Sequence, residues 1–196
     1  FPLTRRMSLT FMIRFSKAAN RPLNWNVLTI DSHAPERYRN QLAAMDRCAA
    51  EGAKVVVTDQ DPDGVAAVAG EIGSVALACD ITVEDNVRAV AALARATYGE
   101  IDVWFSNAGF AGPRQPGDIQ SNELWKLNWE LHVMSHVYAV REVLPAMLAR
   151  GDGYLLQTAS STALSVQPEK LAYTVTKTGA LALAEWLAIN FRTKGV

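Results

Sequence analysis

Three side chains in the C-terminal part of the chain could act together on a proton: Ser160, Tyr173 and Lys177. Tyr173 and Lys177 stand four residues apart at the start of an apolar helical run, so both side chains share one helix face. An ammonium group beside a phenol favours the phenolate, and such a phenol can move protons near neutral pH. Ser160 lies thirteen residues before Tyr173, at the end of a β-type segment. These residue types indicate acid/base chemistry on a bound oxygen atom.

Taken one at a time, these residues have plainer interpretations. A serine after a strand is usually a turn residue, and a tyrosine at a helix start usually packs against its neighbours. The tyrosine–lysine spacing also arises by chance in some chains of this composition. The hypothesis therefore depends on the elements that would position the three side chains.

From about residue 50 onward, short β-branched runs alternate with longer helical ones. This alternation predicts an α/β fold with a doubly wound parallel sheet and helices on both faces. The predicted strands are 54–58, 74–78, 101–106 and 154–158, with a loop at 107–117. The predicted helices run from 62 to the breaks at Gly70 and Gly73, and over 82–99, 121–150 and 172–193.

Local signals predict the ends and faces of these helices. Asp61 can cap the first helix with Pro62 in its first turn, and Thr82 with Asp85 resembles a capping box for the second. Pro145 is expected to kink the last turns of the third. The expected apolar faces consist of Leu124, Leu127, Leu131, Met134, Val137 and Leu144 on the third helix, and of Leu181, Trp186, Leu187 and Ile189 on the last.

The composition predicts a globular protein with a buried core, since 49% of the 196 residues are hydrophobic. Nineteen basic and twenty acidic residues leave a net charge of −1, which argues against a nucleic-acid partner. No apolar stretch approaches the roughly 20 residues that cross a bilayer, so we expect no membrane partner and a cytoplasmic location. Cys48 and Cys79 lack metal-ligand spacing, which favours reduced thiols over a disulfide framework or a metal site.

Residues 1–45 form an atypical N-terminal segment. The first 30 residues include five basic residues and no acidic one, and the first 51 contain none of the twelve glycines. Two interpretations stay open: a transit peptide, or a partly disordered segment that is not native coding sequence. Residues 46–196 are expected to form the folded domain.

The carboxyl ends of the predicted strands carry a series of polar or small residues. In an open parallel sheet, ligands bind beyond these ends. The Asp59 carboxylate could accept both hydroxyls of an adenosine ribose and would repel a 2′-phosphate, which favours NAD over NADP. Asp80 could contact an adenine amino group, and the small residues at 107–109 would let backbone approach a cofactor. Alone, Asp59 and Asp80 read as helix caps or turn residues.

When the residues at these strand ends are considered together with Ser160, Tyr173 and Lys177, the chain resembles the short-chain dehydrogenase/reductase family. The resemblance covers roughly residues 48–196 and implies a partial Rossmann-type NAD(P)-binding domain with hydride transfer to or from an alcohol or carbonyl carbon. It rests on five segments in the family's order: VVVTD (55–59), CDIT (79–82), SNAG (106–109), TASS (158–161) and YTVTK (173–177).

The resemblance also implies residue roles. Tyr173 would be the general acid/base, Lys177 would favour its ionised form and hold the nicotinamide ribose, and Ser160 would bind the substrate oxygen. The cofactor-binding residues that it implies are Asp59, Asp80, Ile81, Asn107, Ala108 and Gly109, together with Tyr173 and Lys177.

The chain departs from the family pattern on the long predicted helix. The family's usual fourth catalytic residue is an asparagine thirteen residues before the proline that is Pro145 here, and that count leads to His132. Asn128 lies one turn earlier on the same face, so either residue could hold the water that relays protons to the lysine. A His132 that is solvated or structurally hydrogen-bonded is the open alternative.

A second departure concerns the family's glycine-rich turn, whose backbone N–H groups meet the cofactor pyrophosphate. We predict a first strand at 24–31 and this turn at 34–41, where APERYRNQ contains no glycine. Side chains there would block close backbone approach, so weak cofactor binding is expected. Codons compatible with residues 35–40, read one nucleotide later, can spell Ser-Gly-Ile-Gly, which makes a local frame slip one hypothesis.

The C-terminal end is expected to be truncated as well, because the family continues past Val196 with further strands and a substrate loop. The loops at 161–172 and 110–120 do not identify the substrate. The first hypothesis is an NAD-dependent oxidoreductase for a small alcohol or ketone, assembled as a homodimer or homotetramer through the two long helices. The alternative is a catalytically impaired or inactive fragment that acts only as a structural or interaction chain.

Overall fold

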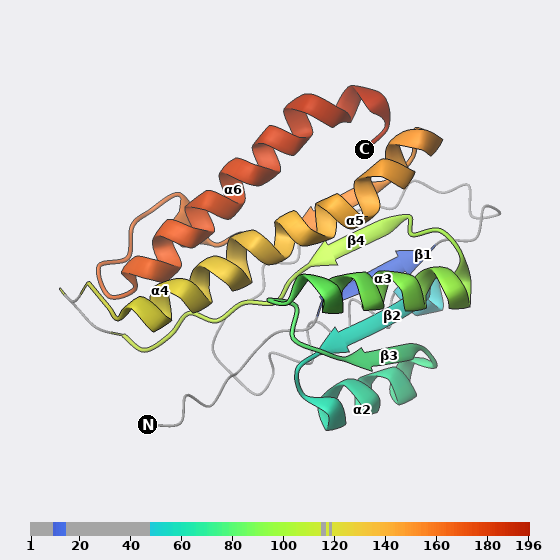
Figure 1. Cartoon of the computed structure of the whole chain (residues 1–196), viewed down its shortest axis with the longest axis horizontal. Helices are drawn as coiled ribbons and strands as arrows, with labels where there is room; N and C mark the ends of the chain where they lie inside the picture. Colours follow the sequence, from blue (N-terminus) through green and yellow to red (C-terminus); the bar gives the residue numbers. More distant parts are fainter. Residues whose placement is uncertain (1–9, 15–47, 115–116, 118) are drawn as a thin grey trace.

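The computed structural model describes residues 10–14, 48–114, 117 and 119–196. These residues form a five-stranded sheet in the order β3-β2-β1-β4-β5, with helices on both faces (Figure 1). The predicted α/β fold is confirmed, and so are the four predicted strands of the regular region. The strands are β1 (Thr10–Arg14), β2 (Lys54–Asp59), β3 (Val75–Ala78), β4 (Val103–Ser106) and β5 (Tyr154–Gln157).

The helices follow the predicted order. No helix among these residues is long and apolar enough to cross a membrane. The elements are α2 (Pro62–Ile72), α3 (Glu84–Tyr98), α4 (Asn122–Trp129), a π-helical segment (Glu130–Met134), α5 (Ser135–Arg150), a 3₁₀ turn (Ser161–Ala163), α6 (Leu171–Phe191) and a final 3₁₀ turn (Arg192–Lys194).

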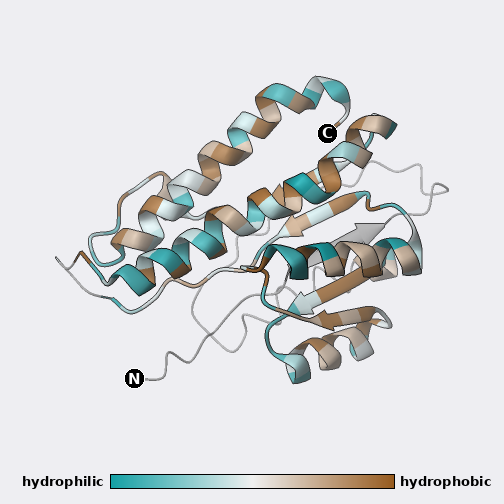
Figure 2. Ribbon diagram, in the orientation of Figure 1, coloured by the Kyte–Doolittle hydropathy of each residue, from teal (hydrophilic) through white to brown (hydrophobic). Residues whose placement is uncertain are grey.

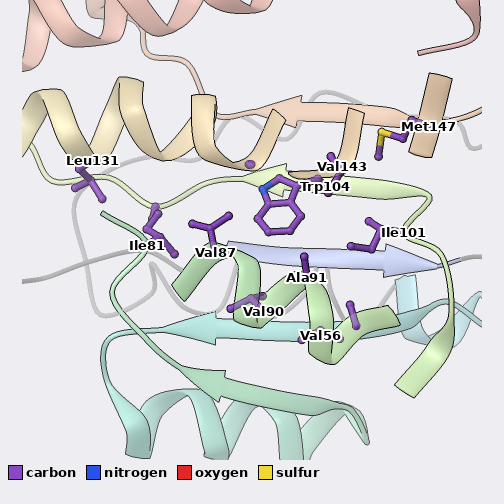
Figure 3. Packing of buried hydrophobic residues seen from close by; sticks show 13 residues of the cluster. Val56, Ile81, Val87, Val90, Ala91, Ile101, Trp104, Leu131, Val143 and Met147 are labelled. Atoms are coloured by element: carbon purple, nitrogen blue, oxygen red, sulfur yellow. The ribbon is translucent and has the colours of Figure 1, made fainter. Parts of the chain in front are cut away.

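The core lies on both faces of the sheet because side chains alternate along a buried strand. Val55 and Val57 face α2, whereas Val56 between them faces α3 and α5. On this second face Trp104 of β4 packs among apolar side chains of both helices (Figure 3). In Figure 2, strands β2 and β3 are mostly apolar, whereas helices α3 to α5 carry both apolar and polar residues.

The central strand differs from the prediction. We expected residues 24–31 to form a first strand in a parallel sheet, but β1 lies between β2 and β4 and is antiparallel to both. Among the described strands, only the pairs β2–β3 and β4–β5 are parallel. The register pairs Thr10 with Thr58, so the amino end of β1 lies at the edge where β2 and β4 end. Residues 24–31 and 34–41 lie outside the described residues.

One predicted helix cap is confirmed and one is wrong. Asp61 caps α2 by accepting a hydrogen bond from the Asp63 N–H. The expected capping box fails because the Thr82 hydroxyl donates to Asp80 Oδ1 instead (2.7 Å). Helix α3 therefore begins after Val83, which makes no side-chain cap.

The predicted helix 121–150 is present, but a π-helical turn divides it into α4 and α5. Of its six expected core residues, Leu124 and Leu131 are buried and the other four are partly exposed. A π turn holds more residues than an α turn, so the face beyond it is rotated relative to an α-helical count. The buried face accordingly carries four polar residues, Asn128, His132, Ser135 and His136.

Helix α6 runs beside this long helix and packs against α4 and the π-helical segment (Figure 1). Leu187 is buried as expected, but Trp186 and Ile189 are 55% and 80% exposed. The prediction that they bury the last helix is wrong, because α6 has packing partners among the described residues on one side only.

Candidate active site

The site lies where β4 and β5 end. The two strands are parallel, with Ser106 paired to Gln157, so the residues that follow them meet at one edge of the sheet. There the Thr158 hydroxyl donates to Asn107 Oδ1 (2.6 Å). This bond joins the first turn after β4 to the first turn after β5.

Lys177 extends this network into helix α6. Its Nζ donates a hydrogen bond to the Thr158 carbonyl oxygen (2.8 Å), and its side chain is almost completely enclosed at 2% exposure. Burial lowers the pKa of Lys177 to about 8, because a low-dielectric interior disfavours the charged form. The ammonium is thus fixed in place and sensitive to mildly alkaline pH.

Tyr173 is half-buried between three side chains. The centre of its ring is 5.9 Å from Lys177 Nζ and 5.8 Å from Lys170 Nζ, which is the range of cation–π contacts. The His132 ring meets it edge-on, with 5.2 Å between ring centres and an interplanar angle of 87°. Lys170 was not among the predicted site residues, although its spacing of three residues from Tyr173 was a usable signal.

Ser160 lies beside the start of α6. It caps the 3₁₀ turn 161–163, which packs against α6. Its Oγ accepts hydrogen bonds from the Thr162 N–H (3.3 Å) and the Thr162 hydroxyl (3.0 Å). The hydroxyl hydrogen of Ser160 is therefore available to a bound oxygen atom. The structure thus brings Ser160 to the helix that carries Tyr173 and Lys177.

A row of polar side chains on the long helix lines the inner side of the site. Asn128 donates to the Leu124 carbonyl within its own helix (3.0 Å), and its Oδ1 has no partner among the described residues. His132 accepts from the Phe110 N–H (3.1 Å) and contacts the Thr176 hydroxyl (2.9 Å). His136 follows one turn later, and burial lowers its pKa to about 3, with a further contribution from the Lys177 charge. His136 was not among the predicted site residues, although its spacing of four residues from His132 was a usable signal.

The second polar group lies at the ends of β2 and β3. Asp59 is 7% exposed, and its Oδ1 accepts from the Asp61 N–H (3.0 Å). Burial raises the pKa of Asp59, and its buried Oδ2 has no hydrogen-bond partner within the described part of the chain. Asp80 Oδ1 accepts from both the N–H and the hydroxyl of Thr82. Both aspartates therefore support turns, and Asp59 keeps one oxygen for another donor.

These residues fit the two ends of a nicotinamide dinucleotide. At one end, Asp59 Oδ2 has no hydrogen-bond donor among the described residues, and a ribose hydroxyl would supply one. At the other, Gly109 leaves room beside the Tyr173–Lys177 pair, since a Cβ at this position would lie 3.4 Å from His132 Nε2 and 3.6 Å from Lys177 Nζ. Asn107, Ala108 and Ile81 are buried around these positions. The turn predicted to meet the pyrophosphate, 34–41, falls outside the described ranges.

The fold and this arrangement define a Rossmann-type α/β protein with a polar site at the carboxyl edge of its sheet. The family described as Enoyl-(Acyl carrier protein) reductase matches residues 42–196. The chain belongs to the short-chain dehydrogenase/reductase family.

Two curated relatives illustrate the similarity. The 2-keto-3-deoxy-L-fuconate dehydrogenase of Xanthomonas campestris pv. campestris is 32% identical over 152 residues, which cover 76% of this chain and 49% of the relative. The 7α-hydroxysteroid dehydrogenase of Escherichia coli K12 is 32% identical over 153 residues, which cover 76% of this chain and 59% of the relative. The chain thus spans about half of these relatives' length.

Solved structures agree with this assignment. A 3-ketoacyl-(acyl-carrier-protein) reductase from Brucella melitensis, complexed with NADH, superposes with a TM-score of 0.72 at 28% identity, covering 78% of this chain and 66% of that one. A 7α-hydroxysteroid dehydrogenase complexed with NADH and 7-oxo glycochenodeoxycholic acid superposes with a TM-score of 0.70 at 30% identity, covering 80% and 62%.

Proposed function

We propose that this chain is an NAD(P)-dependent oxidoreductase that transfers a hydride between a nicotinamide cofactor and a secondary alcohol or carbonyl substrate. One observation carries the proposal. The buried Lys177 ammonium is held by the Thr158 carbonyl within 5.9 Å of the centre of the Tyr173 ring. Burial lowers the pKa of Lys177 to about 8, and titratable groups perturbed in this way cluster at functional sites.

Each residue has a defined part in this proposal. The nicotinamide, when bound, supplies or accepts the hydride. The Tyr173 hydroxyl gives its proton to the substrate oxygen in reduction and takes it back in oxidation. The Ser160 hydroxyl donates a hydrogen bond to the same oxygen and stabilises the charge that develops there. Lys177 would bind the nicotinamide ribose, and Asp59 would bind the adenosine ribose.

The named relatives support the cofactor and substrate class. Two of the similar structures contain NADH, one of them together with a 7-oxo steroid conjugate, and a similar L-sorbose reductase from Gluconobacter frateurii contains NADPH and L-sorbose. We infer a small-molecule alcohol or ketone substrate for this chain. Turnover of NADH with a panel of such ketones, followed by absorbance, tests the proposal, and the absence of turnover with every member would contradict it.

We further propose that NAD is preferred over NADP. The reason is the Asp59 carboxylate, which would accept ribose hydroxyls and repel a 2′-phosphate. Because hydrogen bonds to charged groups contribute about 1.5 to 3 kcal/mol, Asp59→Asn should weaken NAD binding roughly 10- to 100-fold and NADP binding much less. Calorimetric titration of both cofactors measures the change.

The matched control for this prediction is Asp61→Asn. Asp61 lies in the same turn, but its exposed side chain caps α2, and asparagine caps a helix equally well. The control should leave both affinities unchanged. Equal losses for NAD and NADP in Asp59→Asn would show that this carboxylate does not select the cofactor.

The central strand favours a second candidate function, a catalytically impaired relative that serves as a structural or interaction chain. In a Rossmann-type fold the pyrophosphate lies at a helix N-terminus that follows the carboxyl end of the first strand. Here β1 presents its amino end at that edge. No heat of binding at millimolar NAD would support this candidate. Binding that returns when residues 34–41 are replaced by a glycine-rich turn would assign the defect to the missing cradle.

We also propose that the chain forms a homodimer or homotetramer through its two long helices. Val175, Trp186 and Ile189 share one face of α6 and are 42%, 55% and 80% exposed. Large apolar side chains exposed on one helix face indicate an association surface. Replacing both Trp186 and Ile189 with glutamate should convert a dimer to a monomer in sedimentation experiments. Val83→Glu, at an exposed apolar site away from α6, should not, and a monomeric wild type would rule the proposal out.

A further inference from the structure

His132 lies at the middle of the π-helical segment, with no exposed surface. Its two ring nitrogens bond to different parts of the site. Nε2 faces the Phe110 N–H (3.1 Å), which can only donate, so Nε2 must be the acceptor. In a neutral ring the hydrogen then sits on Nδ1 and is donated to Thr176 Oγ1 (2.9 Å). Thr176 completes the chain by donating its own hydroxyl hydrogen to the Ala172 carbonyl (2.8 Å).

This arrangement requires an uncharged imidazole. A protonated His132 would present an N–H to the Phe110 N–H, which is repulsive. Burial lowers the pKa of His132 well below its usual value, and the charges of Lys177 and His136 would lower it further. Within the described part of the chain, the titratable groups that contact or face the ring are Tyr173, Lys177 and His136, and no carboxylate is among them.

With both nitrogens occupied, His132 has none left to hold a water molecule. We propose that His132 is a positioning residue that, as a permanently neutral imidazole, ties the turn after β4 to the first turns of α6. This proposal rests on the proposed function, because the tied parts are those that would hold the nicotinamide and move the proton. This positioning role replaces the proton-relay role that was one of the two predictions for His132.

The contacts of the ring explain why its position matters. It packs in a T-shaped arrangement with the Tyr173 ring, and its Nε2 lies near the space that Gly109 leaves open. A displaced imidazole would therefore shift both the phenol and the Asn107–Phe110 turn. Thr176 is one residue before Lys177, so its bond to His132 also limits rotation of α6. Misplacement of reacting groups by about 1 Å can cost roughly 100-fold in rate.

Two substitutions test the hydrogen-bonded connection through His132, one at His132 and one at Thr176. His132→Phe keeps a flat ring against Tyr173 but removes both hydrogen bonds, and Thr176→Val keeps the side-chain shape but removes the hydroxyl. Each should lower kcat roughly 10- to 100-fold, with little change in KM or in the shape of the pH–rate profile. The double variant should be no worse than His132→Phe alone, because one connection is lost in each case.

Conservative variants separate the two nitrogens. His132→Asn can still donate toward Thr176 but is too short to reach the Phe110 N–H, whereas His132→Gln can place an acceptor near that N–H. Partial recovery of kcat by His132→Gln relative to His132→Phe would support positioning, because glutamine restores the acceptor for the Phe110 N–H. A pH–rate profile that shifts on replacement, or additive losses in the double variant, would overturn the proposal.

A long-range 1H–15N spectrum of the imidazoles tests the geometry without any turnover. The chain has three histidines, and His132→Asn identifies the signals of His132 by their loss. We expect an Nδ1–H tautomer that stays unchanged from about pH 5.5 to 9. An Nε2–H tautomer, or a ring that gains a charge in this range, would contradict the proposal even if the enzyme is active. The expected tautomer in an inactive chain would contradict the proposed function instead.

Discussion

Replacing Tyr173 with phenylalanine should lower kcat by roughly 10²- to 10⁴-fold, the usual contribution of a positioned general acid/base. The ring itself should stay in place, because its contacts with His132, Lys170 and Lys177 involve the ring and not the hydroxyl. The melting temperature should therefore stay close to that of the wild type. The measurement is steady-state reduction of a ketone by NADH, together with thermal unfolding of both proteins.

Tyr138→Phe provides the matched control. Its hydroxyl donates a hydrogen bond to Glu130 (3.2 Å), and it lies on α5 away from the Tyr173–Lys177 pair. The control should keep the wild-type kcat. An unchanged rate in Tyr173→Phe would remove this residue from the reaction, and a rate lost together with the fold would make the loss structural.

Replacing Lys177 with methionine should abolish most activity and yet leave the protein as stable as before, or more so. Methionine has nearly the same shape, so the space around Lys177 stays filled. The buried ammonium is disfavoured in the folded state, as its pKa of about 8 against the usual 10.5 shows. This difference in pKa lowers the free energy of unfolding by about 3 kcal/mol at neutral pH. The hydrogen bond to the Thr158 carbonyl partly offsets the cost of burying the ammonium. We expect kcat to fall roughly 100-fold or more.

The sign of the pH dependence follows from the same shift. Between about pH 8 and pH 10.5 the unfolded state still binds the lysine proton while the folded state has released it. The free energy of unfolding contributed by this group therefore rises with pH in that window. Activity that needs the ammonium should fall as pH rises above about 8. Denaturant unfolding and kcat, each measured from pH 7 to pH 10, check the two trends.

Lys170→Met is the control for this prediction. Its ammonium is equally near the Tyr173 ring, at 5.8 Å, but its side chain is only half-buried. It should show the wild-type alkaline rise in stability and a much smaller loss of kcat. The assignment fails if Lys177→Met is strongly destabilised, or if the alkaline rise persists without the lysine.

Much of the fold was predictable because its signals are local. The runs that form β2 to β5 are short, rich in hydrophobic residues and bounded by turn residues, and Asp61 followed by Pro62 is a cap that needs no distant partner. The order of Asp59, Asn107, Ser160, Tyr173 and Lys177 along the chain also indicated one edge of one sheet, since parallel strands end together. The strands and the helix cap depend on spacing within a strand or a helical turn, and the shared edge follows from the common direction of parallel strands.

Other features depended on contacts that the sequence patterns do not include. Thr82 and Asp85 match a capping box, but Asp80 captures the Thr82 hydroxyl in a turn that a helix-start pattern does not include. The face of the long helix was misjudged because a π turn rotates it, and the partners of that turn lie elsewhere. Trp186 and Ile189 match a core pattern, yet the side of α6 that they occupy has no neighbour among the described elements.

By itself, the amino-acid sequence determined the α/β class, the four regular strands, the helix that carries Tyr173 and Lys177, and the family to which the chain belongs. Only the tertiary structure decided that β1 enters the sheet antiparallel, that Lys177 is enclosed against the Thr158 carbonyl, and that His132 bonds to Phe110 and Thr176. The physical reason is the separation along the sequence over which each interaction acts. Side-chain periodicity and caps act over a few residues, whereas strand direction, burial of a charge and the tautomer of a ring depend on groups 19 to 44 residues apart or more.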